Sequence, residues 1–261
     1  MPHPLPVSKL RRQPRSLRSR VAVDRVLRFV LAGVLLGTLS GCQGIVSSPV
    51  LSQLRVIDAS PDAPGLDIYQ NTSALVYNLG FGTITSYTPL DPGTYTISAK
   101  AAGTAQVLTS AKGTFVASGQ YTALIGNVSA NLQETILKDQ SQPAPSGQIA
   151  LRFISQATRV SPMDVYLVPA GQKLTAVTPL ITNLSFGINT GYLNIPNGSY
   201  TIVMVPTGTV PTSTTVATYT GPQVAYVNGS ASTIILIDQQ LVTTPGLQVI
   251  TATDYIPPTA T

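Results

Sequence analysis

The stretch that decides the fold is LRVI (54–57), which returns 97 residues later as LRFI (151–154). Both copies lie in segments, 53–59 and 149–155, that are rich in β-branched residues or alternate apolar with polar positions, as β-strands do. The same offset relates Asp67-Ile68-Tyr69 to Asp164-Val165-Tyr166. We infer that the chain contains two copies of one strand-rich unit.

Further matches extend each copy to about 90 residues, which is the size of a domain and not of a solenoid repeat. NLGFG (78–82) returns as NLSFG (183–187) and GTYTI (93–97) as GSYTI (198–202), both at an offset of 105, and LKD (137–139) matches LID (236–238) at 99. The second copy therefore gains 8 residues between Tyr166 and Asn183 and loses 6 between Tyr226 and Leu236. Four tyrosine pairs occupy matching places: Tyr69/Tyr166, Tyr87/Tyr192, Tyr95/Tyr200 and Tyr121/Tyr226.

The composition indicates folded domains of short strands. Apolar residues make up 43% of the chain and charged residues only 10%, which argues against disorder, and Gly and Pro number 21 each. DPG (91–93) and PNG (196–198) are turn signals that each lead into a strand. About seven strands per copy, spaced near ten residues apart, predict two tandem antiparallel β-sandwich domains of Ig-like or transthyretin-like class.

We expect the following organisation along the chain. A signal peptide occupies 1–41, a flexible tether 42–51, the first sandwich 52–140, a Pro-containing linker 141–147, the second sandwich 148–242 and a C-terminal tail 243–261, in which 247–251 could add one strand. A domain of this size buries only about 60–65% of its unfolded surface, so docking between the copies would help their stability.

The positive charge is confined to the first residues. Eight basic residues and one acidic residue precede Cys42, whereas seven basic and nine acidic residues follow from Cys42 onward, a net charge of −2. The high pI therefore belongs to the N-terminal segment, and the folded part offers no basic face of the kind that nucleic acid requires. We expect no nucleic-acid partner.

The N-terminal segment has the order of a secretory signal. A basic head is followed by the apolar run FVLAGVLLGTL (29–39) and then by small residues. A transmembrane helix needs about 20 apolar residues, so this run is short for one, although an uncleaved membrane anchor is the alternative.

The step LSGC (39–42) resembles a bacterial lipobox. The resemblance implies that the Cys42 thiol receives a diacylglyceryl group, that signal peptidase II cleaves before this cysteine, and that its amine takes a third acyl chain such as palmitate. More than one acyl chain gives stable anchoring. Gln43 stands where an Asp would retain a lipoprotein at the inner membrane, so the resemblance favours the outer membrane of a Gram-negative bacterium.

The repeat resembles the DUF4397 family of extracytoplasmic domains. The residues that carry the likeness are LRVIDASPDAPGLDIY (54–69), NLGFGTITSY (78–87) and DPGTYTI (91–97). Asp58 stands where the family usually has His, and the second copy keeps only the Asp-Val-Tyr end of the opening motif and has Arg159 in place of Asp62. The likeness implies an exported β-sandwich and no particular activity.

Few residues could carry catalysis. His3 is the only histidine, and it would leave with the signal peptide, so a Ser-His-Asp or Cys-His relay is excluded from the mature chain. The only cysteine, Cys42, would be lipidated, and zinc, copper or non-haem iron sites depend on His or Cys. We therefore expect no cofactor, no metal and no catalytic residue.

Carboxylates leave two alternatives open. Asp58, Asp62 and Asp67, with Ser60 nearby, could bind calcium between strand ends, although SPDAPG (60–65) is also dense in turn-forming residues, which account for this motif without a metal. Asp62 and Asp67 could serve a hydrolase, but Glu134 is the only Glu, and no paired carboxylates are visible. For Asp67 and Asp164 we expect instead that they cap strand ends or accept backbone N–H groups.

The repeated tyrosines also have two interpretations. An exposed set could form a sugar- or protein-binding face, but β-sheets accept Tyr readily, so we expect mostly half-buried core positions, with Phe81 and Phe186 as core residues. The absence of Trp weakens a sugar-stacking interpretation.

The sequence thus predicts a lipid-anchored envelope protein, not an enzyme, with a binding or structural role such as adhesion, matrix formation or assembly. Its partners would be the membrane through the anchor and an envelope protein or glycan, bound by residues that the sequence does not identify. The alternatives are an exported carboxylate-dependent hydrolase and a calcium-stabilised sugar-binding module.

Overall fold

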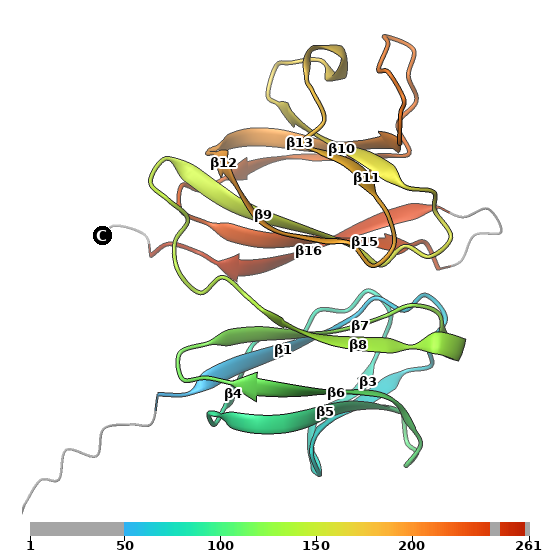
Figure 1. The fold of residues 1–261 in the computed structure, drawn as a ribbon, viewed down its shortest axis with the longest axis vertical. Coiled ribbons are helices and arrows are strands. Elements are labelled where there is room, and N and C mark those ends of the chain that lie inside the picture. Colours follow the sequence, from blue (N-terminus) through green and yellow to red (C-terminus); the bar gives the residue numbers. More distant parts are fainter. Residues whose placement is uncertain (1–49, 241–245, 259–261) are drawn as a thin grey trace, which may run out of the picture. The chain divides into compact units, whose positions relative to one another are not determined.

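The computed structural model describes residues 50–240 and 246–258. The signal segment 1–41 and Cys42, with most of the tether, lie outside the described residues. The described part is all β, as predicted, with four four-stranded sheets and two short 3₁₀ helices, Ser129–Asn131 and Leu174–Ala176 (Figure 1). None of the helices in these ranges is long and apolar enough to cross a membrane.

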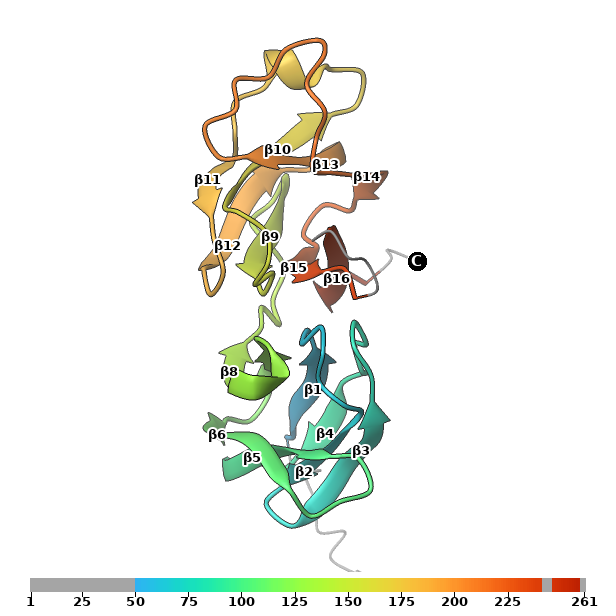
Figure 2. The same cartoon turned by 90° about the vertical axis from the view of Figure 1, so that its right-hand side faces the viewer.

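The first eight strands pair only with one another and form a sandwich of two sheets, drawn in blue to green (Figure 2). The sheets have the orders β4-β1-β7-β8 and β3-β2-β5-β6. The strands are β1 (Ser52–Asp58), β2 (Leu66–Gln70), β3 (Ser73–Leu79), β4 (Thr88–Leu90), β5 (Gly93–Ala101), β6 (Val107–Phe115), β7 (Gln120–Gly126) and β8 (Gln133–Lys138).

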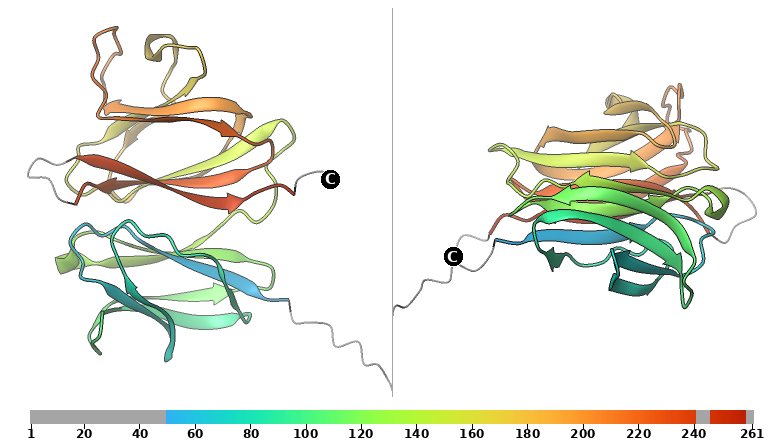
Figure 3. Two further views of the ribbon diagram at one scale, coloured as in Figure 1. Left: turned by 180° about the vertical axis from the view of Figure 1, so that it is seen from behind. Right: turned by 60° about the horizontal axis from the view of Figure 1, so that its bottom comes forward.

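The next eight strands form a second sandwich, drawn in yellow to red (Figure 3). Its sheets have the orders β12-β9-β15-β16 and β11-β10-β13-β14, which repeat those of the first sandwich strand for strand. The strands are β9 (Gln148–Ser155), β10 (Met163–Pro169), β11 (Ile181–Leu184), β12 (Asn189–Pro196), β13 (Gly198–Pro206), β14 (Tyr219–Tyr226), β15 (Ala231–Asp238) and β16 (Leu247–Tyr255).

The sheets depart from the expectation in one respect, because they are not purely antiparallel. β1 pairs in parallel with β7, and β9 pairs in parallel with β15. A parallel pair needs a long crossover, and here the crossover is the rest of the sandwich, β2 to β6 or β10 to β14. The opening strand of each unit therefore lies in the middle of its sheet.

Two of the sequence matches prove to be wrong in register. Asp139 follows β8, whose counterpart is the edge strand β16, so Asp139 corresponds to Asp254 and not to Asp238, which ends β15. Tyr226 pairs with Gly198 as Phe115 pairs with Gly93, so its counterpart is not Tyr121. Short apolar runs in neighbouring strands are similar enough to be aligned one strand out of place.

The segment 243–261, expected as a tail, includes β16, which pairs with β15 from Asp238↔Leu247 to Ala231↔Tyr255. It completes the four-stranded sheet and supplies Asp254.

Each sandwich has its own core, and its opening strand is also buried on the opposite face. Leu54 and Val56 of β1 face the first core, whereas Ile57, on the other face, lies in a separate cluster that also holds Ile154 and Ile235 of the second sandwich. Burial on both faces explains why even the polar residues Arg55 and Asp58 of β1 and Arg152 of β9 are buried. The two sandwiches accordingly lie within one compact unit.

Candidate functional site

Asp67 and Asp164 play the part predicted for them. Asp67 accepts hydrogen bonds from the backbone N–H groups of Asn78, at 2.8 Å, and Gly103, at 2.9 Å. These donors hold the pKa of Asp67 below its usual value. Both oxygens are occupied by the backbone, so this carboxylate fixes loops.

Asp164 occupies the equivalent place in the second sandwich. It accepts from the backbone N–H groups of Asn183, at 2.9 Å, and Gly208, at 3.0 Å. Burial raises its pKa, but the two backbone hydrogen bonds outweigh burial, and the pKa lies below its usual value. Asn183 and Gly208 both have positive φ, 57° and 82°, a conformation that Asn and Gly adopt most easily.

Asp58 and Asp62 differ in burial and in hydrogen-bond partners. Asp58 is fully buried at the end of β1, where its Oδ1 accepts from the N–H of Ser60 at 3.0 Å, while its Oδ2 and the Ser60 hydroxyl have no partner. Burial raises the pKa of Asp58 to about 7. Asp62 is exposed and accepts from the N–H and hydroxyl of Ser129.

These carboxylates do not share hydrogen-bond partners. Asp58, Asp62 and Asp67 each bond to different partners, and the described ranges contain no group of three or more His, Cys, Asp or Glu placed to hold a metal ion. In the described ranges they therefore do not form a ligand set of three carboxylates for calcium. Their hydrogen bonds instead hold the loops and turns in which the donor groups lie.

A larger ionic cluster, which the sequence did not reveal, lies between the two sandwiches. Arg55 of β1 donates from Nε to the Thr122 hydroxyl at 2.8 Å, from Nη1 to the Thr253 carbonyl at 2.8 Å, and from Nη2 to Asp254. The side chains of Arg55 and Asp254 are 2% and 0% exposed, so water does not screen this pair.

Arg152 of the second sandwich makes the equivalent contacts to the first sandwich. Arg152 of β9 donates from Nε to the Thr233 hydroxyl at 3.0 Å, from Nη1 to the Lys138 carbonyl at 3.1 Å, and from Nη2 to Asp139 at 2.5 Å. Each arginine therefore bonds within its own sheet through Nε and reaches the aspartate of the other sandwich through Nη2. The relation is reciprocal, as at the interface of a two-fold symmetric dimer.

Two tyrosines complete the cluster. Tyr87 donates its hydroxyl to Asp139 at 2.7 Å, and Tyr192 donates to Asp254 at 2.9 Å. Their rings lie 4.7 Å from the guanidinium carbons of Arg55 and Arg152. Burial, reinforced by the neighbouring aspartates, raises the pKa of both tyrosines well above the usual value. We call this set the arginine–aspartate latch; its members are Arg55, Tyr87, Thr122, Asp139, Arg152, Tyr192, Thr233 and Asp254.

The repeated tyrosines thus divide into three groups. Tyr95 and Tyr121 lie in or against the first core, and Tyr200 and Tyr226 against the second, as expected. Tyr87 and Tyr192 belong to the latch, and Tyr69 and Tyr166 lie on the opposite face of their strands from the cores. Tyr166 is buried in a cluster on the outward face of its sheet and Tyr192 packs against a small buried cluster, so these positions are also largely buried, although they lie away from the two main cores. Phe81 packs in the cluster shared by the sandwiches, whereas Phe186 is 37% exposed.

One titratable group is buried without a partner. Glu134 lies on the edge strand β8 opposite Ile125, a residue of the first core, and neither of its carboxyl oxygens has a hydrogen-bond partner. Burial raises its pKa to about 8. Burial without a partner therefore favours the protonated form of this carboxyl.

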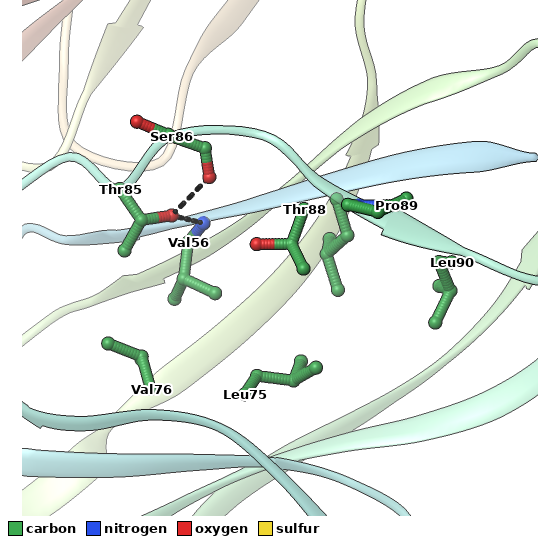
Figure 4. A pocket seen from close by; sticks show the side chains of 9 residues that line it. Val56, Leu75, Val76, Thr85, Ser86, Thr88, Pro89 and Leu90 are labelled. Atoms are coloured by element: carbon green, nitrogen blue, oxygen red, sulfur yellow. Dashed lines mark hydrogen bonds between the residues drawn. The ribbon is translucent and has the colours of Figure 1, made fainter.

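An apolar cavity of about 150 Å³ opens at the edge of the first sandwich between β3 and β4 (Figure 4). Thr85 spans its rim by accepting from the N–H of Val56 at 2.9 Å and donating to the Ser86 carbonyl at 3.1 Å. Thr88 lines the cavity and pairs with Leu54 of β1. At the equivalent place in the second sandwich, Leu193 pairs with Leu151 and packs against the core. The smaller Thr side chain leaves this space unfilled.

The comparisons with known proteins find one family domain and assign no role to the chain. A domain of unknown function, DUF4397, is found at residues 52–166, which span the first sandwich, β9 and part of β10. No curated protein sequence matches the chain significantly.

Two solved structures align with the chain at low similarity. One is the carbohydrate-binding module CBMbc (family CBM26) of Eubacterium rectale Amy13K in complex with maltoheptaose, with 12% identity, 79% of this chain and 98% of that chain covered, and a TM-score of 0.23. The other is a putative cell adhesion protein of Bacteroides fragilis NCTC 9343, with 10% identity, 80% and 100% covered, and a TM-score of 0.19. These scores are too low to support an argument about function.

Proposed function

We propose that this protein is a lipoprotein of the Gram-negative cell envelope whose two sandwiches have a binding or structural role and no catalytic one. The observation that carries the proposal is LSGC (39–42), preceded by an apolar run and a basic head. Cys42 is the only cysteine, and β1 begins ten residues later, at Ser52. Acyl chains on this sulfur and on the new N-terminus would hold the sandwiches close to the outer membrane.

We extend the DUF4397 assignment to the second sandwich. Its support is the identical strand order and the recurrence of the buried groups: Arg152 for Arg55, Asp164 for Asp67 and Tyr192 for Tyr87. In this proposal the two domains are tandem copies that dock through the latch.

The non-catalytic role is supported by the use that the fold makes of its reactive groups. Two arginines and two aspartates are paired with one another in the latch. Asp67 and Asp164 hold loops through backbone hydrogen bonds, and burial raises the pKa of Glu134. Catalytic carboxylates are placed where substrate can reach them and beside one another, and these are not.

Membrane fractionation tests the anchor. A Cys42→Ser variant should lose incorporation of labelled palmitate and leave the membrane fraction. Gln43→Asp is the matched control, which should keep the label and stay membrane-bound but move to the inner membrane. A Cys42→Ser protein that remains in the outer membrane would contradict the proposal.

A further inference from the structure

The sheets β11-β10-β13-β14 and β3-β2-β5-β6 differ in how the face away from the core is covered. In the second sandwich Tyr166 and Val168 of β10 and Val203 and Val205 of β13 form a buried apolar cluster on the face away from the core. Three residues from long connections pack onto it: Leu174, Val177 and Ala217. Leu174 and Val177 lie in the β10–β11 connection, where the second sandwich is 8 residues longer. This face is closed by the protein's own chain.

The equivalent face of the first sandwich is polar and mostly exposed, although Ser98 within it is only 8% exposed. Ser98 and Lys100 of β5 stand where β13 has Val203 and Val205, and β2 and β3 are joined by only Asn71 and Thr72. Lys100 Nζ lies 4.0 Å from the ring centroid of Tyr69. We call this surface of β2, β3, β5 and β6 the open face.

An exposed aromatic ring marks the open face. Tyr77 of β3 is 66% exposed, and its ring meets that of Tyr69 edge-on at a centroid distance of 6.4 Å. A tyrosine held by a neighbouring ring, with most of its own surface in water, is a ready contact for a flat, partly apolar ligand. The second sandwich has Thr182 at the position that corresponds to Tyr77.

Hydroxyl groups and positive charge continue along the same face on the neighbouring strands β5 and β6. Thr94 and Thr114 are paired across β5 and β6 with their hydroxyls 3.0 Å apart, and Thr96 is paired with the exposed Lys112. Asp67, the acid of β2 beside Lys100, has both carboxylate oxygens occupied by backbone N–H groups. Lys100 and Lys112 therefore keep positive charge available for an incoming anion.

We propose that the open face binds a carboxylate-bearing polysaccharide, with Tyr77 contacting a sugar ring, Lys100 and Lys112 pairing with uronate groups, and the threonine hydroxyls bonding to sugar hydroxyls. Short hydroxyl side chains both donate and accept, as sugar hydroxyls do. An acidic peptide would match the charge but would leave this hydroxyl row without equivalent partners. The inference rests on the proposed role as a binding protein of the envelope, and it names the ligand class and the residues.

Affinity electrophoresis with the detergent-solubilised full-length protein tests the proposal. Migration is compared in gels containing alginate or polygalacturonate, which carry carboxylates, and in gels containing neutral dextran. The wild type should be retarded by the uronate polymers and not by dextran. Lys100→Gln and Tyr77→Ser should each weaken the retardation about tenfold in apparent Kd, the effect of losing one charge-assisted or aromatic contact.

Matched controls separate this site from general charge. Lys173→Gln removes an exposed lysine from the second sandwich and should leave the retardation unchanged. Because Lys100 and Tyr77 lie outside the cores, all variants should melt like the wild type. Absence of uronate binding, equal binding by Lys100→Gln and Lys173→Gln, or equally strong capture of a polyglutamate peptide would overturn the proposal. Membrane fractionation of the same samples reports separately on the anchor.

Discussion

The arginine–aspartate latch predicts a large and specific loss of stability when one arginine is removed. In Arg152→Met the aliphatic stem is kept, but three hydrogen bonds disappear, to Thr233, Lys138 and Asp139. Asp139 keeps its bonds from Tyr87 and Thr122 but loses its closest positive charge while remaining 0% exposed.

The magnitude follows from that burial. Breaking a buried ion pair by removing one partner costs about 3–5 kcal/mol, mainly because the other charge stays buried without compensation. Arg55 lies 3.6 Å from Asp139 and offsets part of the loss, so we expect a value near the lower end, about 3 kcal/mol. Replacing both partners, as in Arg152→Met/Asp139→Leu, should recover most of it, because no charge is then left unpaired.

Urea unfolding monitored by circular dichroism measures the effect. The control is Arg159→Met, which removes an arginine whose side chain is 39% exposed and lies 3.8 Å from Asp238; it should cost less than about 1 kcal/mol. The reasoning is refuted if Arg152→Met and Arg159→Met cost the same, or if the double variant is no more stable than Arg152→Met alone.

Three further perturbations follow from the structure. Glu134→Gln should stabilise the protein increasingly as pH rises from about 4.5 to 8, by up to a few kcal/mol, because the unfolded carboxyl ionises at pKa 4.5 and the folded one only near 8; equal unfolding free energies of variant and wild type at pH 5 and pH 8.5 would contradict this. Thr88→Leu should fill the cavity at β3 and β4 and raise the unfolding free energy by about 1 kcal/mol, whereas a lower melting temperature would show that the space cannot take the side chain. Tyr87→Phe and Tyr192→Phe each remove one hydroxyl from the latch and should cost about 1–2 kcal/mol, with Tyr192→Phe the costlier because the Tyr192 hydroxyl also accepts from the N–H of Gln140 at 3.1 Å; thermal melts in which Tyr192→Phe costs less than Tyr87→Phe would contradict this.

Much of the fold could be predicted because the motifs that define its strands and turns occur twice in the sequence. The matching LRVI and LRFI strands, the two Asp-apolar-Tyr motifs and the glycine turns identified two all-β units and the loop-holding role of Asp67 and Asp164. These features are local, so alternation and turn chemistry report them directly.

The latch could not be predicted for a physical reason. In a half-exposed strand, an arginine between apolar residues marks the solvent face, and Arg55 between Leu54 and Val56 fits that pattern. Only the docking of two sheets turns that face into an interior one. Asp254 was also hidden, because β16 follows a polar segment and resembled a tail. The one available signal was that an arginine recurs at the same position of both copies.

The open face was equally hidden, because it is defined by a difference between the copies. The sequence located the 8 extra residues after Tyr166, but not that the longer connection covers a sheet face that the first copy leaves free.

The central claim, that lipid on a single sulfur holds these sandwiches in the envelope, is tested most directly by mass spectrometry of the N-terminal peptide of the protein isolated from membranes. The account predicts a peptide that begins at Cys42 and carries the mass of a diacylglyceryl group and a further acyl chain. A peptide that begins at Met1, or an unmodified Cys42, would contradict it.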